Sequence, residues 1–525
     1  MRRNITVGIL VTMLMLVSST NVRAQDGLSQ ALAALNAGNP LTAVKLLEPY
    51  VKEHPSSFKA AMGLGNAYYL LGRIEDAKVW FENALELKPD DVNARANLAT
   101  TASALGEYNL AVGTYMELVR EHPRNDEFHN NLGVVYTAMG DYEKAENSFQ
   151  KALSIRPSQH EYYLRLGELY ELTGKHTKAL DSFKNALKLS PSTVDPLLAI
   201  AGIYRDRSDF RTARTYLLRA LKVDPKSWEA MGELGVLEEF QGNYDKAAYR
   251  YIQALRIKQD ATKYLNRLAG VFTKKGDYEQ ATNYYRQLIA LDPGSAEAHG
   301  ELGIALARAG EHYEAVAELK ASLDRRPGHV RYLNALGESY LALEKHEMAV
   351  SCFEDVLKAE PDNLDARLRL GIVAFERKRF DRAEKYLRGV LAMARANADA
   401  RYYVGMVDVE KKRYDEAKKH FEELRERFPE DARVYYGLGL AYSRAGDIQR
   451  GINYHTKAVE LNEKNLDSHW ELAKLYESVG DNQMAYRHLK RILLVDPNHH
   501  LKDLIMDRLE ALREEGVVDN DWQNF

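Results

Sequence analysis

Cysteine is almost absent from this sequence: among 525 residues there is one, Cys352. A single cysteine excludes an intrachain disulfide framework and every metal or redox site built from paired cysteines. An excess of basic residues is also missing, because 76 acidic residues outnumber 72 basic ones and the formal net charge is −4. Proteins hold nucleic acid largely by neutralising its phosphates, so we expect no nucleic-acid partner.

Long apolar runs are scarce as well, and the one that stands out lies near residue 1. Arg2 and Arg3 precede a largely apolar stretch over 5–17, which is followed by a cleavage-like sequence at 22–24. This order is typical of a secretory signal, and the stretch is shorter than the ~20 residues that span a membrane. We predict a signal peptide over 1–24, no transmembrane segment in the mature chain, and a periplasmic or secreted location. An uncleaved N-terminal anchor is the alternative.

What the sequence does contain is one motif repeated every 34 residues, with position 1 at residues 24, 58, 92 and so on to 466. Small residues recur at position 8, from Gly65 to Gly439, and alanine recurs at position 20. Proline stands at position 32 in 11 of the 14 repeats, although the chain has only 14 prolines. A period of this length indicates a solenoid of stacked units, here 14 repeats over 25–499.

The recurring residues have physical roles. Positions 7, 8 and 11 share one face of a first helix, and positions 20, 24 and 27 share one face of a second helix. The small residues at 8 and 20 let the helices approach, and the aromatic residue at 24 fills the space beside them. Glycine at 15 suits the C-terminal cap of the first helix, and Asp or Asn at 16 can cap the start of the second helix. Proline at 32 is expected to end the second helix. In the fourth repeat the marks are Leu132, Gly133, Tyr136, Ala145, Phe149, Ala152 and Pro157.

This set of marks resembles the tetratricopeptide repeat family. The resemblance implies an all-α fold, a right-handed α-solenoid of paired antiparallel helices whose concave groove is lined mainly by the first helix of each pair. The first repeat is degenerate, with Pro40 and Pro49 in its second helical stretch. We predict a capping helix over 500–515 and a polar tail over 516–525. The apolar stripe of the capping helix consists of Leu501, Leu504, Ile505, Leu509 and Leu512.

Catalytic and cofactor motifs do not occur: there is no phosphate loop, dinucleotide fingerprint, nucleophile elbow or HExxH. His129, His299 and His469 share position 4, and we interpret them as residues of a helix–helix seam rather than as metal ligands or acid–base groups. We interpret Cys352 as an inert, semi-exposed thiol rather than a redox sensor. The prediction is a protein that is not an enzyme, with no catalytic residues, no cofactor and no metal.

Two rows of side chains fall on groove positions, which the resemblance assigns to partner binding. Asn66, Asn97 and Asn131 stand at positions 9, 6 and 6 of repeats 2 to 4, where the family uses asparagines as a ladder for a peptide backbone. The alternative is that they are solvated polar residues. A carboxylate clamp is disfavoured, because Met62 and Glu127 occupy the places of its lysines.

The second row is aromatic. Tyr402, Tyr436 and Trp470 occupy position 5 of repeats 12 to 14, and Phe375, at position 12 of repeat 11, lies close in register. We predict a continuous apolar ridge that stacks sugar rings or grips aromatic side chains of a peptide. The alternative is additional packing between neighbouring first helices.

These observations predict a non-enzymatic scaffold that captures an extended peptide or a helix of another protein in its groove, in the assembly or stabilisation of a cell-envelope complex. The alternative is a periplasmic adaptor for polysaccharide in an exopolysaccharide synthesis or export system, similar to the repeat regions of the cellulose synthase C subunit. The aromatic row favours this alternative.

Overall fold

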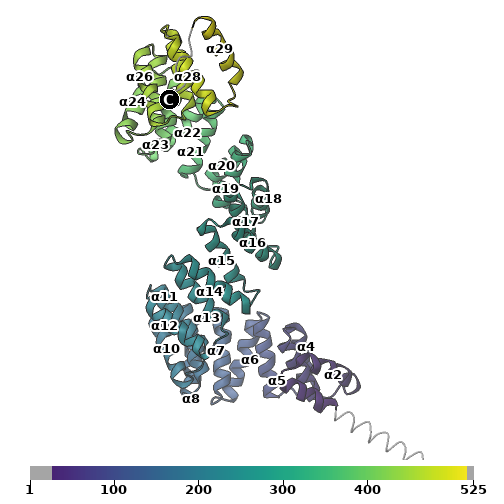
Figure 1. Ribbon diagram of the computed structural model, residues 1–525. Coiled ribbons are helices and arrows are strands. Elements are labelled where there is room, and N and C mark those ends of the chain that lie inside the picture. The colour runs from purple at the N-terminus through teal and green to yellow at the C-terminus, as the bar shows by residue number, and fades with distance from the viewer. Residues whose placement is uncertain (1–26, 517–525) are drawn as a thin grey trace, which may run out of the picture. The chain divides into compact units, whose positions relative to one another are not determined.

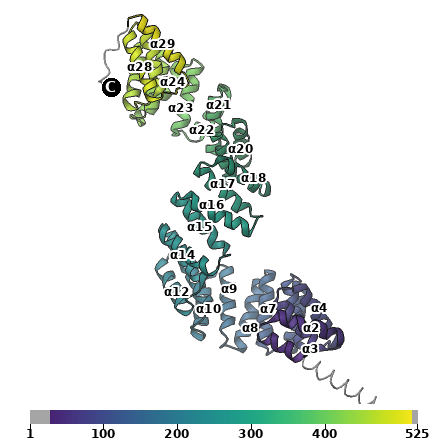
Figure 2. The same cartoon turned by 45° about the vertical axis from the view of Figure 1, so that its right-hand side comes forward.

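The computed structural model describes residues 27–516, and every regular element within that range is an α-helix. The predicted signal peptide (1–24) and the predicted tail beyond Gly516 lie outside the described residues. The chain divides into two compact units, Met1–Gln259 and Asp260–Phe525, and each is a stack of antiparallel helix pairs (Figures 1 and 2). The predicted all-α solenoid is confirmed.

In the N-terminal unit residues 27–36 are helical. They are followed by α2 (Pro40–Glu53), α3 (Phe58–Leu70), α4 (Ile74–Leu87), α5 (Val92–Ala104), α6 (Tyr108–Glu121), α7 (Asp126–Met139), α8 (Tyr142–Ile155), α9 (His160–Leu172), α10 (His176–Leu189), α11 (Asp195–Asp206), α12 (Phe210–Val223), α13 (Trp228–Phe240) and α14 (Tyr244–Ile257). The C-terminal unit contains α15 (Thr262–Lys275), α16 (Tyr278–Leu291), α17 (Ala296–Ala309), α18 (His312–Arg325), α19 (Val330–Ala342), α20 (His346–Ala359), α21 (Leu364–Glu376), α22 (Phe380–Met393), α23 (Ala398–Glu410), α24 (Tyr414–Arg427), α25 (Ala432–Arg444), α26 (Ile448–Leu461), α27 (Leu466–Ser478), α28 (Asn482–Val495) and α29 (Lys502–Glu514).

In the repeats that have glycine at position 8, the seam between the two helices depends on the missing side chain. In repeat 4, a Cβ atom added to Gly133 would lie 2.7 Å from the ring of Phe149, and at Gly65 the distance to Phe81 would be 2.5 Å. Contacts this short do not occur between real Cβ atoms and rings, so in these two repeats the ring at position 24 needs glycine at position 8 to lie where it does.

The turn between the two helices needs a left-handed residue. Gly140, at position 15 of repeat 4, has φ +84°, and the side chain of Asp141 accepts a hydrogen bond from the backbone N–H of Lys144 at 3.3 Å. The same position is left-handed in repeats that lack glycine, where φ lies between +56° and +61°. These residues are Ser208, Glu344, Lys378 and Lys412.

Proline at position 32 is not what ends the second helix. α8 ends at Ile155, two residues before Pro157, and α14 ends at Ile257, two residues before Gln259, which replaces the proline. In both helices the C-cap residue has left the helical conformation, with φ −130° at Arg156 and −124° at Lys258, and the next first helix begins in the same register. The boundary between the two units falls after Gln259, at one of the three junctions without proline.

Two residues differ from their sequence interpretation. Cys352 is buried in α20 beside Phe353, with 7% of its surface exposed, and burial raises the pKa of its thiol to about 11. It is therefore not semi-exposed. In α29, Ile505, Leu509 and Leu512 are buried against α28, whereas Leu504 is 54% exposed and lies outside the packed stripe.

Candidate binding surface on the first helices

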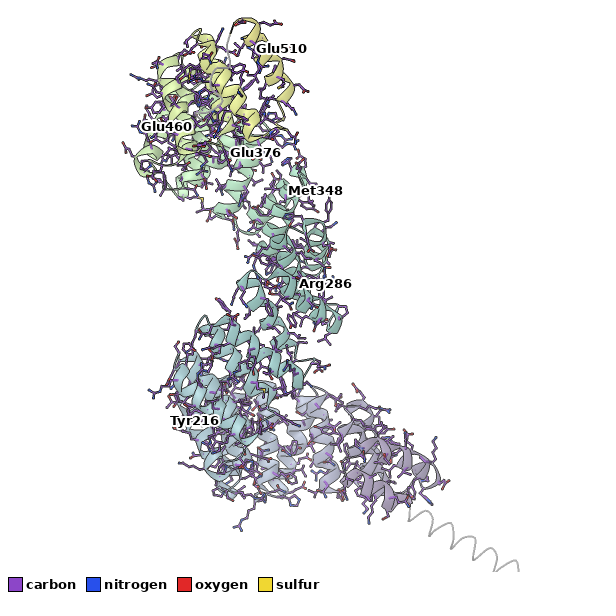
Figure 3. All side chains as sticks on the ribbon, viewed as in Figure 1. Tyr216, Arg286, Met348, Glu376, Glu460 and Glu510 are labelled. Carbon is purple, nitrogen blue, oxygen red and sulfur yellow. The ribbon has the colours of Figure 1, made fainter. Side chains whose placement is uncertain are left out.

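Three of the four predicted aromatic residues lie on successive first helices of the C-terminal unit. Phe375 of α21, Tyr402 of α23 and Tyr436 of α25 are half-buried and border one apolar cluster, whose buried members include Phe421. The ring centroids of Tyr402 and Phe421 are 5.8 Å apart. Figure 3 labels Glu376, the residue after Phe375. Each of these side chains therefore packs against its neighbours and keeps part of its surface exposed.

Tyr403 extends this surface, although it is not among the residues predicted from the sequence. Its ring centroid lies 5.6 Å from that of Phe375 and 5.3 Å from that of Tyr402, both in edge-on geometry. The signal was present, because Tyr403 stands at position 6, next to a predicted groove residue. We call Phe375, Tyr402, Tyr403 and Tyr436 the aromatic surface. Trp470 is not part of it, because it packs in the next cluster with Leu466, Tyr476 and Leu501.

Ion pairs between α23 and α25 border the aromatic surface. Arg433 pairs with Asp399 at 3.2 Å, and its guanidinium carbon lies 5.5 Å from the ring centroid of Tyr402. Near the other ends of the two helices, Arg444 Nη1 donates to Glu410 Oε1 at 2.7 Å. Because each pair joins neighbouring first helices, the rings between them are held in place before any partner arrives.

Both tyrosines of position 5 remain neutral at ordinary pH. Burial raises the pKa of Tyr402 far above its usual 10, and the neighbouring phenols add to the effect. Burial also raises the pKa of Tyr436, together with the charges of Asp467 and Glu471. The aromatic surface is therefore an uncharged, partly apolar strip with hydroxyl groups, bordered by charged side chains.

The asparagine row of the N-terminal unit is only partly continuous. Asn97 Nδ2 donates to Asn66 Oδ1 at 3.0 Å, which links α5 to α3. Asn131 instead donates to the hydroxyl of Tyr115 at 3.3 Å, and that hydroxyl donates to the carbonyl of Ala96 at 3.0 Å. The structure thus brings two of the three amides together and connects the third through a tyrosine of a second helix, which sequence reasoning missed.

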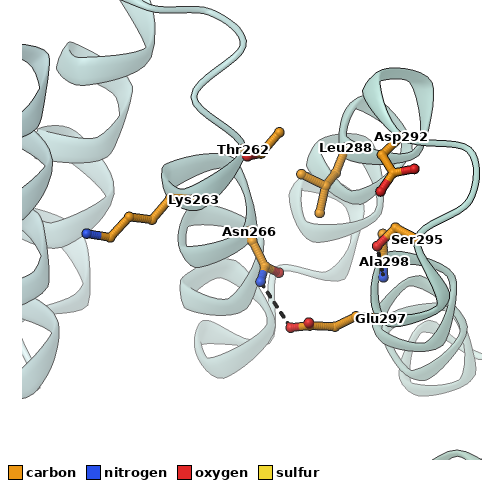
Figure 4. A pocket seen from close by; sticks show the side chains of 8 residues that line it. All are labelled: Thr262, Lys263, Asn266, Leu288, Asp292, Ser295, Glu297 and Ala298. Atoms are coloured by element: carbon orange, nitrogen blue, oxygen red, sulfur yellow. Dashed lines mark hydrogen bonds between the residues drawn. The ribbon is translucent and has the colours of Figure 1, made fainter. Parts of the chain in front are cut away.

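A polar pocket of about 270 Å³ lies between α15 and the beginning of α17 (Figure 4). Asn266 Nδ2 donates to Glu297 Oε1 across it at 3.2 Å, and the hydroxyl of Ser295 caps α17 by accepting from the N–H of Ala298 at 3.2 Å. Asn266 stands at position 5, like the aromatic residues, although it is not among the residues predicted from the sequence. The amide of Asn266 and the carboxylate of Glu297 are bonded to each other, so the pocket is a small polar recess.

The histidines of position 4 have a structural role. Each ring Nε2 lies within hydrogen-bond distance of a backbone carbonyl six residues earlier, at position 32, and a carbonyl can only accept. The pairs are His129–Pro123 (3.1 Å), His299–Pro293 (3.2 Å) and His469–Glu463 (3.3 Å). Arg401 and Tyr435, also at position 4, donate to the same carbonyl of their own turns. In these repeats, the side chain at position 4 therefore links the first helix to the turn before it.

Neither a metal-binding cluster nor a membrane-spanning helix is found among residues 27–516. No group of three or more His, Cys, Asp or Glu side chains in this range is arranged to hold a metal ion. Nor does this range contain a helix whose length and apolar character would let it cross a bilayer.

Family models match most of the repeats described above. Tetratricopeptide repeat models match residues 28–92, 334–401, 374–440 and 432–465. The chain belongs to the tetratricopeptide repeat family. Two other models also match: the C-terminal domain of cilia and flagella-associated protein 70 over 125–329, and a bacterial transcriptional activator domain over 79–158. Tetratricopeptide repeats are typically non-catalytic scaffolds, and their fold suggests protein partners.

Individual relatives share the repeat over limited lengths or at low identity. Superkiller protein 3 of Schizosaccharomyces pombe is 34% identical over 91 residues, which are 17% of this chain and 7% of that protein. The crystal structure of the APC/C hetero-tetramer Cut9-Hcn1 is 16% identical, with a TM-score of 0.41 over 92% of this chain and 95% of that one. A tetratricopeptide repeat protein from Parabacteroides merdae is 19% identical, with a TM-score of 0.42 over 49% of this chain and 99% of its own.

Proposed function

We propose that this tetratricopeptide repeat protein is a non-enzymatic scaffold that binds an extended peptide or a helix of another protein along its first helices. The observation that carries the proposal is the aromatic surface: Phe375, Tyr402, Tyr403 and Tyr436 are half-buried on three successive first helices. Aromatic residues that are fixed on one side and open on the other are the usual anchors of protein interfaces.

The physical basis of binding is prior order. The ring of Tyr402 packs against Phe421, and the pairs Arg433–Asp399 and Arg444–Glu410 join α23 to α25. A partner that docks on this surface loses its own freedom, while the scaffold loses little. Burying apolar area then contributes about 25 cal/mol per Å².

The direct test is capture from cell-envelope extract with the full chain and with Tyr436→Ala. We expect one stoichiometric protein to be captured by the parent and lost with the substitution. Tyr313→Ala is the matched control, because Tyr313 is a 73% exposed tyrosine on second helix α18 of the same unit. Asn97→Ala asks whether the asparagine row takes part. Equal capture by the Tyr436→Ala and Tyr313→Ala variants would overturn the proposal.

We place this function in the cell envelope, in the assembly or stabilisation of a complex there. The support is the sequence of residues 1–24, which has the order of a secretory signal. Cell fractionation together with the intact mass of the mature protein tests it. We expect a periplasmic or secreted protein that begins near Gln25, and a full-length cytoplasmic protein would contradict this.

A polysaccharide adaptor is the second candidate, and the aromatic surface is the observation that favours it, because sugar rings stack on aromatic faces. Oligosaccharide titration monitored by the intrinsic tyrosine and tryptophan fluorescence of the chain separates the two candidates. A saturable change that Tyr436→Ala removes and Tyr313→Ala preserves would favour polysaccharide. No change, together with capture of a protein, would favour the scaffold.

A further inference from the structure

The C-terminal unit has a second open surface, on its second helices rather than its first. A pocket of about 550 Å³ lies between α26 and α28, with residues of α27 at its floor. Figure 3 labels Glu460, which lies on its α26 side. Its lining is largely apolar and aromatic, and it includes Leu494, a leucine that is 59% exposed. Leu494 therefore adds an exposed apolar side chain to this lining.

The chain leaves its last described helix beside this pocket. Arg513 Nε, in the last turn of α29, donates to the hydroxyl of Tyr486 at 3.0 Å, and Tyr486 lines the pocket. One residue after the helix, Glu515 Oε2 accepts a hydrogen bond from Asn482 Nδ2 at 2.8 Å. Gly516 then takes φ +92°, a left-handed conformation that ends the helix and turns the chain. Residue 517 therefore follows directly after a point that is bonded to α28.

The residues that come next, 517–525, complement the pocket in composition. Their charged side chains are both acidic, Asp519 and Asp521, and they include two aromatic residues, Trp522 and Phe525. The pocket carries three cations on α28 against two carboxylates beside α26, and one of those carboxylates, Glu463, is already paired with Arg491 at 2.8 Å. The cations are Arg487, Lys490 and Arg491.

We propose that residues 517–525 of this same chain bind in the pocket between α26 and α28, with Trp522 against Leu494 and the two aspartates toward the cations of α28. The tether to the segment is short, because the six residues from Gly516 to Trp522 extend at most about 20 Å. A short tether keeps the segment at an effective concentration of about 1 mM, so even a free-peptide Kd of about 0.1 mM gives a bound-to-free ratio of about ten. The segment would then compete with any partner for this face of the last two repeats.

The experiment uses the full chain labelled with 5-fluorotryptophan, whose four tryptophans give separate fluorine resonances in NMR. The resonance of Trp522 is identified by its loss in Trp522→Phe. A bound Trp522 gives a broad line displaced from that of the free 517–525 peptide, and this is the expected result. A sharp line at the position of the free peptide would overturn the proposal.

Leu494→Glu should return Trp522 to the free line, with at least a tenfold fall, or about 1.4 kcal/mol, in the bound-to-free ratio. Leu504→Glu is the matched control, because Leu504 is 54% exposed on α29 and does not line the pocket, so it should leave the line displaced. Asp519→Asn with Asp521→Asn changes only the segment, and should move the line toward the free position even if Leu494→Glu disturbs α28. A displaced line insensitive to Leu494→Glu, or one that becomes free on dilution, would overturn binding within one chain.

Discussion

Glu146 in the N-terminal unit and Glu384 in the C-terminal unit stand at the same position, 21, of repeats 4 and 11. Each is largely buried and accepts hydrogen bonds from the repeat that follows. Glu146 accepts from the hydroxyl of Tyr170 at 2.7 Å and from two lysines, Lys175 at 2.9 Å and Lys178 at 3.2 Å. Although burial alone would raise its pKa, these bonds lower it to about 2.

In the C-terminal unit, all of the donors to the glutamate are charged, and no tyrosine hydroxyl takes part. Glu384 accepts from Lys411 at 2.7 Å, and from Arg413 and Arg388 at 2.8 Å each, and its pKa is also lowered to about 2 against the effect of burial. At position 11, where repeat 5 has Tyr170, repeat 12 has Asp408, which is fully buried. Arg413 Nη2 lies 2.5 Å from Asp408, and Arg388 lies 3.5 Å from it.

The glutamate at position 21 thus links neighbouring repeats by hydrogen bonds in both units, but the amount of buried charge around it differs. The C-terminal unit goes further at position 24, where His455 is fully buried in place of the usual phenylalanine, tyrosine or leucine, and at position 23, where His488 is largely buried. The two units therefore have similar helices but are expected to respond differently to pH and to loss of charge.

Acidification should give the largest difference between the units. Burial lowers the pKa of His455 to about 3 and that of His488 to about 4, with nearby positive charges adding to the effect. The unfolded chain, with histidine pKa near 6.5, binds these protons first, so stability is lost as the pH falls below about 6.5. At pH 4.5 the two histidines together should remove about 5 kcal/mol from the C-terminal unit, at 1.36 kcal/mol per pH unit for each group.

The measurement is pulsed hydrogen exchange in increasing urea at pH 7 and pH 4.5, read peptide by peptide. Peptides from α25 to α28 should unfold at much lower urea at pH 4.5, whereas those around Glu146 should change little, because its stabilising contribution is lost only between about pH 4.5 and 2. The raised pKa of buried Asp408 acts in the opposite sense, since the folded chain takes up that proton more readily. Equal acid sensitivity in the two units would contradict the prediction.

Removal of the two carboxylates should give the next largest difference. Glu384→Ala leaves Arg388, Arg413 and Lys411 without their common partner and should lower the free energy of unfolding of the C-terminal unit by about 2–3 kcal/mol. Glu146→Ala should lower that of the N-terminal unit by about 1 kcal/mol, because Lys175 and Lys178 are 47% and 58% exposed and water can replace the carboxylate. Urea titrations of both variants by circular dichroism test the order, and equal losses would show that the added charge at Asp408 makes no difference.

The period and the sizes of residues were sufficient to predict the seams and turns. Glycine at position 8 against an aromatic residue at 24 is a matter of volume, and Gly133 and Phe149 pack as those volumes require. The buried charge was not predictable in this way. Asp408 and His455 stand at positions whose usual residues are apolar or aromatic. The charged partners of Asp408 come from α22, from the turn before α24 and from α24, whereas His455 is buried without a hydrogen-bond partner among the described residues.

For the candidate surface, the sequence predicted which face of a helix each residue occupies but not which residues contact one another. A repeat position tells which side of a helix a residue occupies, so Tyr402 and Tyr436 were found. It does not tell which residue of the next repeat lies opposite. Asn97 therefore meets Asn66, while Asn131 is bonded to Tyr115, whose hydroxyl reaches over from a second helix. The pocket of α26 and α28 had no sequence signal, because its lining combines residues of two second helices with residues of the first helix between them, α27.

Restoring the usual residue at position 24 should stabilise the C-terminal unit by a smaller amount. Neither ring nitrogen of His455 meets a hydrogen-bond partner among the described residues, and its ring lies against Gly439 as Phe149 lies against Gly133. His455→Phe keeps the ring and removes two buried polar atoms, which should add about 1–2 kcal/mol at pH 7. Thermal unfolding checks the sign, and the same variant should lose about half of the acid sensitivity described above. A lower Tm than the parent would contradict the prediction.

The smallest effect is expected at the turns, where the two units can be compared at position 15. Lys412 has φ +60° and is exposed, so its side chain contributes strain to the backbone and little packing. Lys412→Gly relieves about 1 kcal/mol of left-handed strain, and the greater freedom of glycine in the unfolded chain offsets about half of it. The net gain should be about 0.5 kcal/mol in urea titration. Gly140→Ala, at the same position of the N-terminal unit with φ +84°, should lose about 1 kcal/mol, and a gain there would mean that the turn tolerates a Cβ atom.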